Sequence, residues 1–249
     1  MSRLLTLLMA AWLTALASMT ALVPMTARAA EPGVQAPIGL KLLDLPVPAG
    51  FADALRELPQ IRLIGERMTP PSNRLLAIFM SQADHDRARA GQTPSMQRYF
   101  MVQTLRQAEL AVVSVADFGQ VRNLLRQQYQ RLLKQAGSQT QGLLDSAMRE
   151  ISRDAGIESL SLKAGEVKGL EVFDERPGSI SLLAATRFVA QADGRTEEVP
   201  MALAITTAVV KGKLLYFYAY AVYREPADLD WLRGVTRDWL ALAAASNPP

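Results

Sequence analysis

The clearest pattern along this chain is an alternation between large apolar and small or polar positions in its second half. A period of two residues is typical of β-strands whose two faces differ. It predicts strands over residues 160–163, 167–174, 179–191, 199–210 and 213–223. Short turn sequences separate the later strands, namely Arg176-Pro177-Gly178, Asp193-Gly194 and Lys211-Gly212. Consecutive strands joined by such short turns indicate an antiparallel meander.

Two other segments repeat their apolar residues every three to four positions, which predicts amphipathic helices. The first is a helical section over residues 115–155, with Gly137 and Gly142 at a weak point in its middle. We expect either two helices or one long kinked helix there. The second is a C-terminal helix that begins with Pro226, a residue favoured at the first helical position.

The first half of the chain has shorter patterns. An extended segment is expected over 38–47, a Pro/Gly corner over 45–51, and one or two helical turns over 51–58. Further along, the pattern predicts a hairpin of 61–68 with 74–81, a short helix over 82–90, and a strand over 97–105.

The last hairpin allows a more specific prediction. A two-residue turn at Lys211-Gly212 places Ile205 opposite Tyr218 and Thr206 opposite Phe217. One face of the hairpin then carries Met201, Leu203, Ile205, Tyr216, Tyr218 and Tyr220, and the other carries Ala202, Ala204, Ala219 and Ala221. An alanine surface lets a helix approach closely. We therefore expect the C-terminal helix to pack on the alanine face through Trp231 and Trp239, with these strands central in the sheet and covered on both sides.

Together these patterns predict an α+β fold in which an antiparallel β-sheet is flanked by helices, an α/β sandwich. Residues 1–29 are expected to be a signal peptide, because Arg3 precedes an uncharged stretch over 4–27 and Ala27-Arg28-Ala29 forms a small-x-small cleavage sequence. The mature protein would then be a single exported domain over 30–249, periplasmic or secreted. The alternative is an uncleaved anchor, since residues 4–23 are just long enough to span a bilayer.

Composition narrows the possible functions. Loss of residues 1–29 removes Arg3 and Arg28 but no acid, so 27 basic and 24 acidic side chains become 25 and 24. This near balance gives no reason to expect nucleic-acid binding. The chain has no cysteine, so a hydrophobic core without disulfides must hold the fold together. With one histidine as well, thiol catalysis, cysteine zinc sites and multi-histidine metal centres are excluded, and we expect no metal or cofactor.

Two segments resemble the PsbP-like α/β sandwich family. One is Leu45-Pro46-Val47-Pro48-Ala49-Gly50-Phe51, and the other runs from Lys211-Gly212-Lys213-Leu214-Leu215-Tyr216 through Pro226-Ala227-Asp228 to Trp231 and Trp239. The resemblance covers about a quarter of the chain. It implies an antiparallel sheet between helices and a non-enzymatic, protein-binding role, and it carries over no functional residue.

Three alternating tyrosines are the first candidate for a binding site. Tyr216, Tyr218 and Tyr220 share a face with Leu203 and Ile205, where their rings could form the wall of a cleft and their hydroxyls could orient a small apolar ligand. The alternative is an ordinary covered sheet face whose hydroxyls bond to neighbouring loops.

A basic run in the helical section is the second candidate. Arg122, Arg126, Arg131 and Lys134 have no acid near them in sequence, so they could contact anionic lipid headgroups or an acidic partner. Phe118 and Tyr129 are the aromatic residues available as anchors. The simpler interpretation is a solvated helix surface.

Catalytic candidates are few. Asp84-His85-Asp86 is a dense cluster of titratable groups, but its three side chains diverge on a helix, and an exposed helix start capped by Asp84 explains it more simply. Acids near turns could act as an acid–base pair in a hydrolase, namely Glu171, Asp174, Glu175, Glu197 and Glu198. The sequence favours a non-enzymatic protein that binds an envelope protein or a small apolar ligand. Peripheral membrane association and a carboxylate-dependent hydrolase remain the alternatives, and the oligomeric state is left open.

Overall fold

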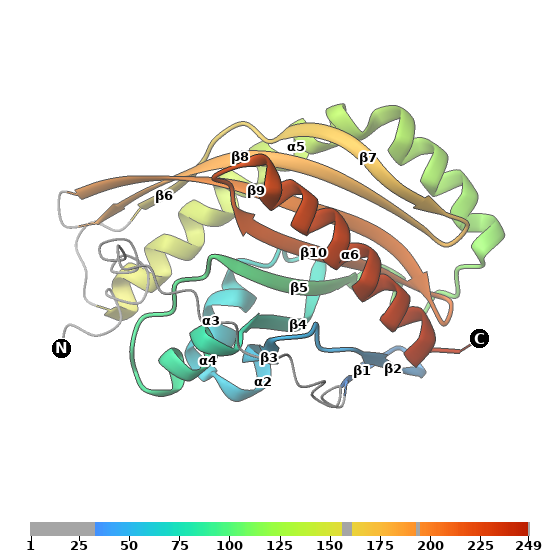
Figure 1. Ribbon diagram of the computed structural model, residues 1–249, viewed down its shortest axis with the longest axis horizontal. Coiled ribbons are helices and arrows are strands. Elements are labelled where there is room, and N and C mark those ends of the chain that lie inside the picture. Colours follow the sequence, from blue (N-terminus) through green and yellow to red (C-terminus); the bar gives the residue numbers. More distant parts are fainter. Residues whose placement is uncertain (1–32, 156–160, 193–194, 249) are drawn as a thin grey trace.

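The computed structural model describes residues 33–155, 161–192 and 195–248. It shows an α+β fold with an eight-stranded antiparallel sheet flanked by helices, as the sequence predicts. In Figure 1 the C-terminal helix α6 (Pro226–Ser246) crosses in front of the sheet, while the long helix α5 (Val115–Ala155) passes behind it. The predicted signal peptide and the Asp193-Gly194 turn lie outside the described residues.

The sheet combines the C-terminal meander with strands from the first half of the chain. Its order is β3-β4-β5-β10-β9-β8-β6, and β7 also pairs with β8. The strands of this sheet are β3 (Phe51–Asp53), β4 (Asn73–Ser81), β5 (Arg98–Leu105), β6 (Ser161–Ala164), β7 (Lys168–Arg176), β8 (Ser179–Ala192), β9 (Arg195–Val210) and β10 (Lys213–Val222). A separate hairpin consists of β1 (Val34–Ile38) and β2 (Lys41–Leu45).

The register of the last hairpin is the one predicted from its turn. Tyr218 pairs with Ile205 and Phe217 with Thr206. Lys211 and Gly212 both have positive φ, at 48° and 75°, which is the backbone of a type I′ turn and matches the twist of the flanking strands. Because side chains alternate along strands, this register assigns the alanines and the tyrosines of β10 to opposite faces.

The alanine face is covered by α6 (Pro226–Ser246), as predicted. Ala204 and Ala219 are fully buried beneath this helix. The ring of Trp239 fills the space above them, and its centroid lies 4.9 Å from those of Phe100 and Phe217. Trp231 packs at the edge of the same cluster, and the β1–β2 hairpin completes the cover.

The opposite face is covered from two sides. Helix α5 (Val115–Ala155) packs over β8 and β9, with Phe118 fully buried against Ile180 and Leu182. The short helices α2 (Ala54–Glu57) and α3 (Pro59–Arg67) pack over β4. The remaining helical elements are α4 (Gln82–Arg89) and the 3₁₀ turn η2 (Arg106–Ala108).

The structure decides between the two alternatives for residues 115–155 and contradicts the strand predicted over residues 61–68. Residues 115–155 form one continuous helix rather than two, and it follows a curved course around the sheet in Figure 1. The predicted strand over 61–68 is wrong, because residues 61–67 belong to α3 and Met68 is its C-cap. Pro59 stands at its first turn, and Ile61, Ile64 and Met68 recur at helical spacing. No helix in the described part of the chain is long and apolar enough to cross a bilayer.

The close contact between α6 and the alanine face predicts a specific cost of enlarging it. Ala219→Leu should lower the free energy of unfolding by about 1–3 kcal/mol, because the added carbons have no space beneath Trp239. The matched control Ala245→Leu, at an exposed position of α6, should change it by less than about 0.5 kcal/mol. Urea denaturation of both variants measures the difference, and equal effects would contradict this packing.

Candidate functional site

The predicted tyrosine site contains a fourth tyrosine from a distant part of the chain. Strand β5 lies beside β10, and Tyr99 pairs directly with Tyr220. Their rings stack with centroids 4.4 Å apart at an interplanar angle of 9°. Tyr218 follows at 6.2 Å from Tyr220, and Tyr216 at 6.5 Å from Tyr218. We call these four residues the tyrosine ladder.

The hydroxyls of the tyrosine ladder are unpaired within the described part of the chain. None of them forms a hydrogen bond with another described residue, and none is sealed from solvent. Each of the four side chains retains partial exposure. Tyr99, Tyr216 and Tyr218 also join none of the apolar clusters formed by the described residues. The ladder is therefore not the interior of a closed core.

The protein nevertheless surrounds these rings closely. Burial raises the pKa of Tyr99, Tyr218 and Tyr220 far above the usual value, because the charged phenolate is poorly solvated there, and neighbouring tyrosines add a smaller effect at Tyr218 and Tyr220. Burial also raises the pKa of Tyr216. Rings that are surrounded by protein and still accessible, with hydroxyls left unpaired, could stack on a ligand and donate hydrogen bonds to it.

Helices from both ends of the sheet flank the tyrosine ladder. On the α5 side, Leu133 packs against Leu203, with Ile205 and Tyr220 at the edge of the cluster. On the other side, Met80 and Ile78 pack beneath α2 and α3, with Met101 at the edge. The two helical walls meet where Met148 and Ile151 of α5 contact Ile64 and Met68. Methionines on these walls provide flexible, polarizable contacts.

Leu203 and Ile205 lie on the predicted face but have different roles. Leu203 is 9% exposed and is held beneath Leu133, so it supports the sheet rather than facing open space. Ile205 remains partly exposed next to Tyr218, its partner across the strands.

The basic run of α5 does not form one surface. Arg122 and Arg126 both contact the carboxylate of Glu175 on β7, at 3.2 and 3.3 Å. Arg122 also donates a hydrogen bond to the backbone oxygen of Arg176. The two aromatic residues considered as anchors, Phe118 and Tyr129, pack inward against the sheet. These contacts hold α5 against β7 without any external partner.

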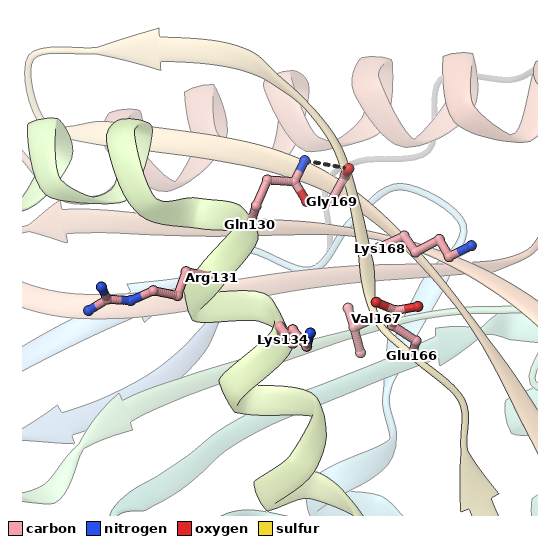
Figure 2. Close-up of a pocket in the computed structure, with 7 residues that line it drawn as sticks. All are labelled: Gln130, Arg131, Lys134, Glu166, Val167, Lys168 and Gly169. Carbon is pink, nitrogen blue, oxygen red and sulfur yellow. Dashed lines mark hydrogen bonds between the residues drawn. The ribbon is translucent and has the colours of Figure 1, made fainter.

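Arg131 and Lys134 instead line an open pocket between α5 and the start of β7. Its other lining residues are Gln130, Glu166, Val167, Lys168 and Gly169. Figure 2 shows the Arg131 and Lys168 side chains pointing away from each other, so the cations do not converge on a common point. Gln130 closes part of the pocket by donating a hydrogen bond to the Gly169 oxygen.

The structure contradicts the prediction that Asp84-His85-Asp86 is an exposed helix start capped by Asp84. Ser81, not Asp84, caps α4, and Asp84 and His85 are 3% and 2% exposed rather than on the surface. Asp84 accepts hydrogen bonds from the Ser95 amide and hydroxyl and from the Met96 amide, which fixes the following loop. No group of three possible metal-binding side chains occurs among the described residues.

The candidate acids of a hydrolase are mostly held by arginines. Glu171 accepts a hydrogen bond of 2.7 Å from Arg233. Asp174 contacts Arg176 at 2.9 Å and Arg237 at 3.6 Å. Glu175 is shared by the two arginines of α5, and Glu198 contacts Arg187 at 3.1 Å. Glu197 differs, because burial raises the pKa of its carboxyl. The contacts of Glu171, Asp174 and Glu175 with arginines of α5 and α6 join β7 to both helices, and the pairs do not bring two free carboxyls together.

Comparison with known protein families and with curated proteins finds no match for this chain.

The raised pKa values of the tyrosine ladder predict how stability depends on pH. The folded protein keeps the stability that these tyrosines contribute below pH about 10, the pKa of an unfolded tyrosine. It loses this stability as the pH rises from there toward the higher pKa values of the folded tyrosines. The reason is that the unfolded chain releases phenolic protons that the folded chain retains. Phenolate absorbance and circular dichroism should therefore change together in an alkaline titration.

Replacing Tyr99, Tyr218 and Tyr220 with phenylalanine together should move the alkaline unfolding midpoint to higher pH. Tyr223→Phe, which removes a phenol from the α6 side of the sheet, is the matched control and should shift it less. Ionisation of the ladder while the fold stays intact would contradict the closely surrounded site.

Proposed function

We propose that this protein is an exported, non-enzymatic binding protein that holds a small apolar ligand against the tyrosine ladder. The observation that carries the proposal is a row of four adjacent rings whose hydroxyls reach solvent without an internal partner. Buried polar groups are normally paired, so accessible and unpaired hydroxyls on a mostly apolar face favour a ligand with hydrogen-bond acceptors.

The shape of the ladder indicates the kind of ligand. Aromatic rings stack on flat or extended apolar groups, and hydroxyls spaced along one strand can each donate to an ether or carbonyl oxygen. The methionine side chains of the flanking clusters adapt to different shapes. We infer a planar or elongated apolar molecule with a few oxygen atoms. An apolar segment of an envelope protein is the macromolecular alternative.

The other two sequence hypotheses gain less support. The basic run lacks outward aromatic anchors, and half of it is occupied by Glu175. The candidate acids are mostly engaged by arginines. The resemblance to PsbP-like proteins agrees with a binding role but adds no ligand.

A binding titration tests the proposed site. The neutral fluorophore N-phenylnaphthylamine should bind the purified protein saturably, with a fluorescence increase. Tyr218→Ala, which removes a central ring of the ladder, should weaken binding by about tenfold, a loss of roughly 1.4 kcal/mol. Tyr223→Ala removes a ring from the other face and is the matched control.

Tyr218→Phe removes the hydroxyl and keeps the ring, so it tests the contribution of the hydroxyl alone. It should leave fluorophore binding nearly intact and reduce retention of any oxygen-containing molecule that copurifies with the protein, measured by mass spectrometry. Non-saturable binding to the parent protein, or equal affinity for the parent and the Tyr218→Ala variant, would reject the tyrosine ladder as a site.

Export is tested separately. Mass spectrometry of the protein isolated from the envelope fraction of its host should give an N-terminus at Ala30, because cleavage is expected after Ala29. Recovery of a chain that still contains residues 4–23 would favour the membrane anchor instead.

A further inference from the structure

We propose that one end of the molecule docks onto a lipid bilayer that contains anionic headgroups. The docking surface is an apolar ridge formed by exposed aliphatic residues of the β1–β2 hairpin and of the segment between η2 and α5. Its members are Leu40, Leu42, Leu110, Val112 and Val115, with exposed fractions of 97%, 56%, 80%, 72% and 49%.

Their grouping distinguishes these residues from ordinary surface apolar groups. The other large hydrophobic residues exposed in the described chain lie singly on α3, α5, β7 and α6, and single exposures of this kind are common. The ridge instead joins parts of the chain that are about seventy positions apart. Exposed apolar side chains that gather from separate parts of the chain indicate an interaction site.

Several contacts hold the two parts of the ridge together. The hairpin turn approaches the segment so closely that a Cβ on Gly39 would lie 2.3 Å from the Glu109 oxygen. The buried Lys213 ammonium donates hydrogen bonds of 2.8 Å to the carbonyls of Glu109 and Ala111, on either side of Leu110. Arg74 links Glu109 to the Pro37 oxygen of the hairpin.

The remaining part of the ridge rests on two turns of the sheet. Val113 donates a hydrogen bond of 2.9 Å to the Gly212 oxygen, and Val112 lies against that glycine. Val115 packs beside Gly178 in the β7–β8 turn. The exposed aliphatic groups are therefore presented by a fixed scaffold, which lowers the entropic cost of inserting them.

The charges around the ridge are mainly positive. Lys41 is exposed beside Leu40, Lys211 lies in the adjacent turn, and the Lys213 ammonium lies below. Three acids lie nearby: Glu109 is bound by Arg74, Asp117 accepts hydrogen bonds from Ser114, and the Asp44 carboxylate on β2 lies against Gly33. This distribution complements anionic headgroups.

The residue types favour a lipid over a protein partner. The centres of protein interfaces are enriched in aromatic residues and depleted in lysine. The ridge contains only leucine and valine and is flanked by lysines, which suits insertion of aliphatic side chains between headgroups that the lysines contact.

Cosedimentation with vesicles tests this proposal. The chain from Ala30 is used, because residues 33–248 contain every core cluster described and the apolar leader would itself bind lipid. The protein should sediment with vesicles of equal parts phosphatidylethanolamine and phosphatidylglycerol. Binding should be weaker to vesicles of phosphatidylcholine alone and should fall as salt is added.

The double variant Leu40→Ser with Leu110→Ser should lower the partition coefficient about a hundredfold, roughly tenfold for each leucine withdrawn from the bilayer. The control, Leu63→Ser with Leu242→Ser, removes two exposed leucines on α3 and α6 and should leave it unchanged. Lys41→Gln should reduce binding to the anionic vesicles alone. Circular dichroism confirms that each variant is folded.

Two results would overturn the proposal: no sedimentation of the parent protein, or equal sedimentation of the parent and the double variant. If the parent does not sediment and the double variant loses self-association, the ridge is instead a contact between protein copies. The tyrosine ladder is intact in these variants, so fluorophore binding reports on the proposed function independently.

Discussion

The structure depends on the close approach of α6 to the sheet, which only small side chains permit. Ala202, Ala204, Ala219 and Ala221 leave room for the Trp239 indole, which contacts the rings of Phe79, Phe100 and Phe217 and donates a hydrogen bond to the Pro46 oxygen. Because side chains alternate along a strand, β10 places its tyrosines on the opposite face. The register that places the alanines beneath α6 therefore also places the tyrosines on the other face.

The two faces of the sheet therefore differ in how completely their side chains are buried. Trp239 and its neighbours are almost completely buried, and a core of this density supports the fold without disulfides. On the other face, α5 and α3 each cover one end, and the ladder occupies the region between their clusters. Sealing four unpaired hydroxyls there would be costly, so their access to solvent is compatible with stability. A ligand that accepts their hydrogen bonds could replace that solvent.

The sequence predicted the local features and missed the long-range ones. The Lys211-Gly212 turn determines the β9–β10 register, and the alanines indicate where α6 packs, because both depend on neighbouring residues. The position of β5 beside β10 depends on a pairing across more than a hundred residues, so Tyr99 was not included in the site. The pattern from Ile61 fits a helix or a short strand, and tertiary packing on β4 decides between them. The contacts of Glu175 with α5 and the burial of His85 likewise depend on tertiary structure.

Strand β10 connects the two proposed surfaces. At its start, Lys213 points to the alanine side and holds the ridge segment through two backbone carbonyls. Tyr216, the first member of the ladder, follows three residues later on the other side, roughly 10 Å along the strand. A bilayer at the ridge would therefore lie near the same end of the sheet as the beginning of the ladder. Leu214 and Phe118 fill the intervening part of that face. The ridge and the ladder thus have separate contacts, and either could act without the other.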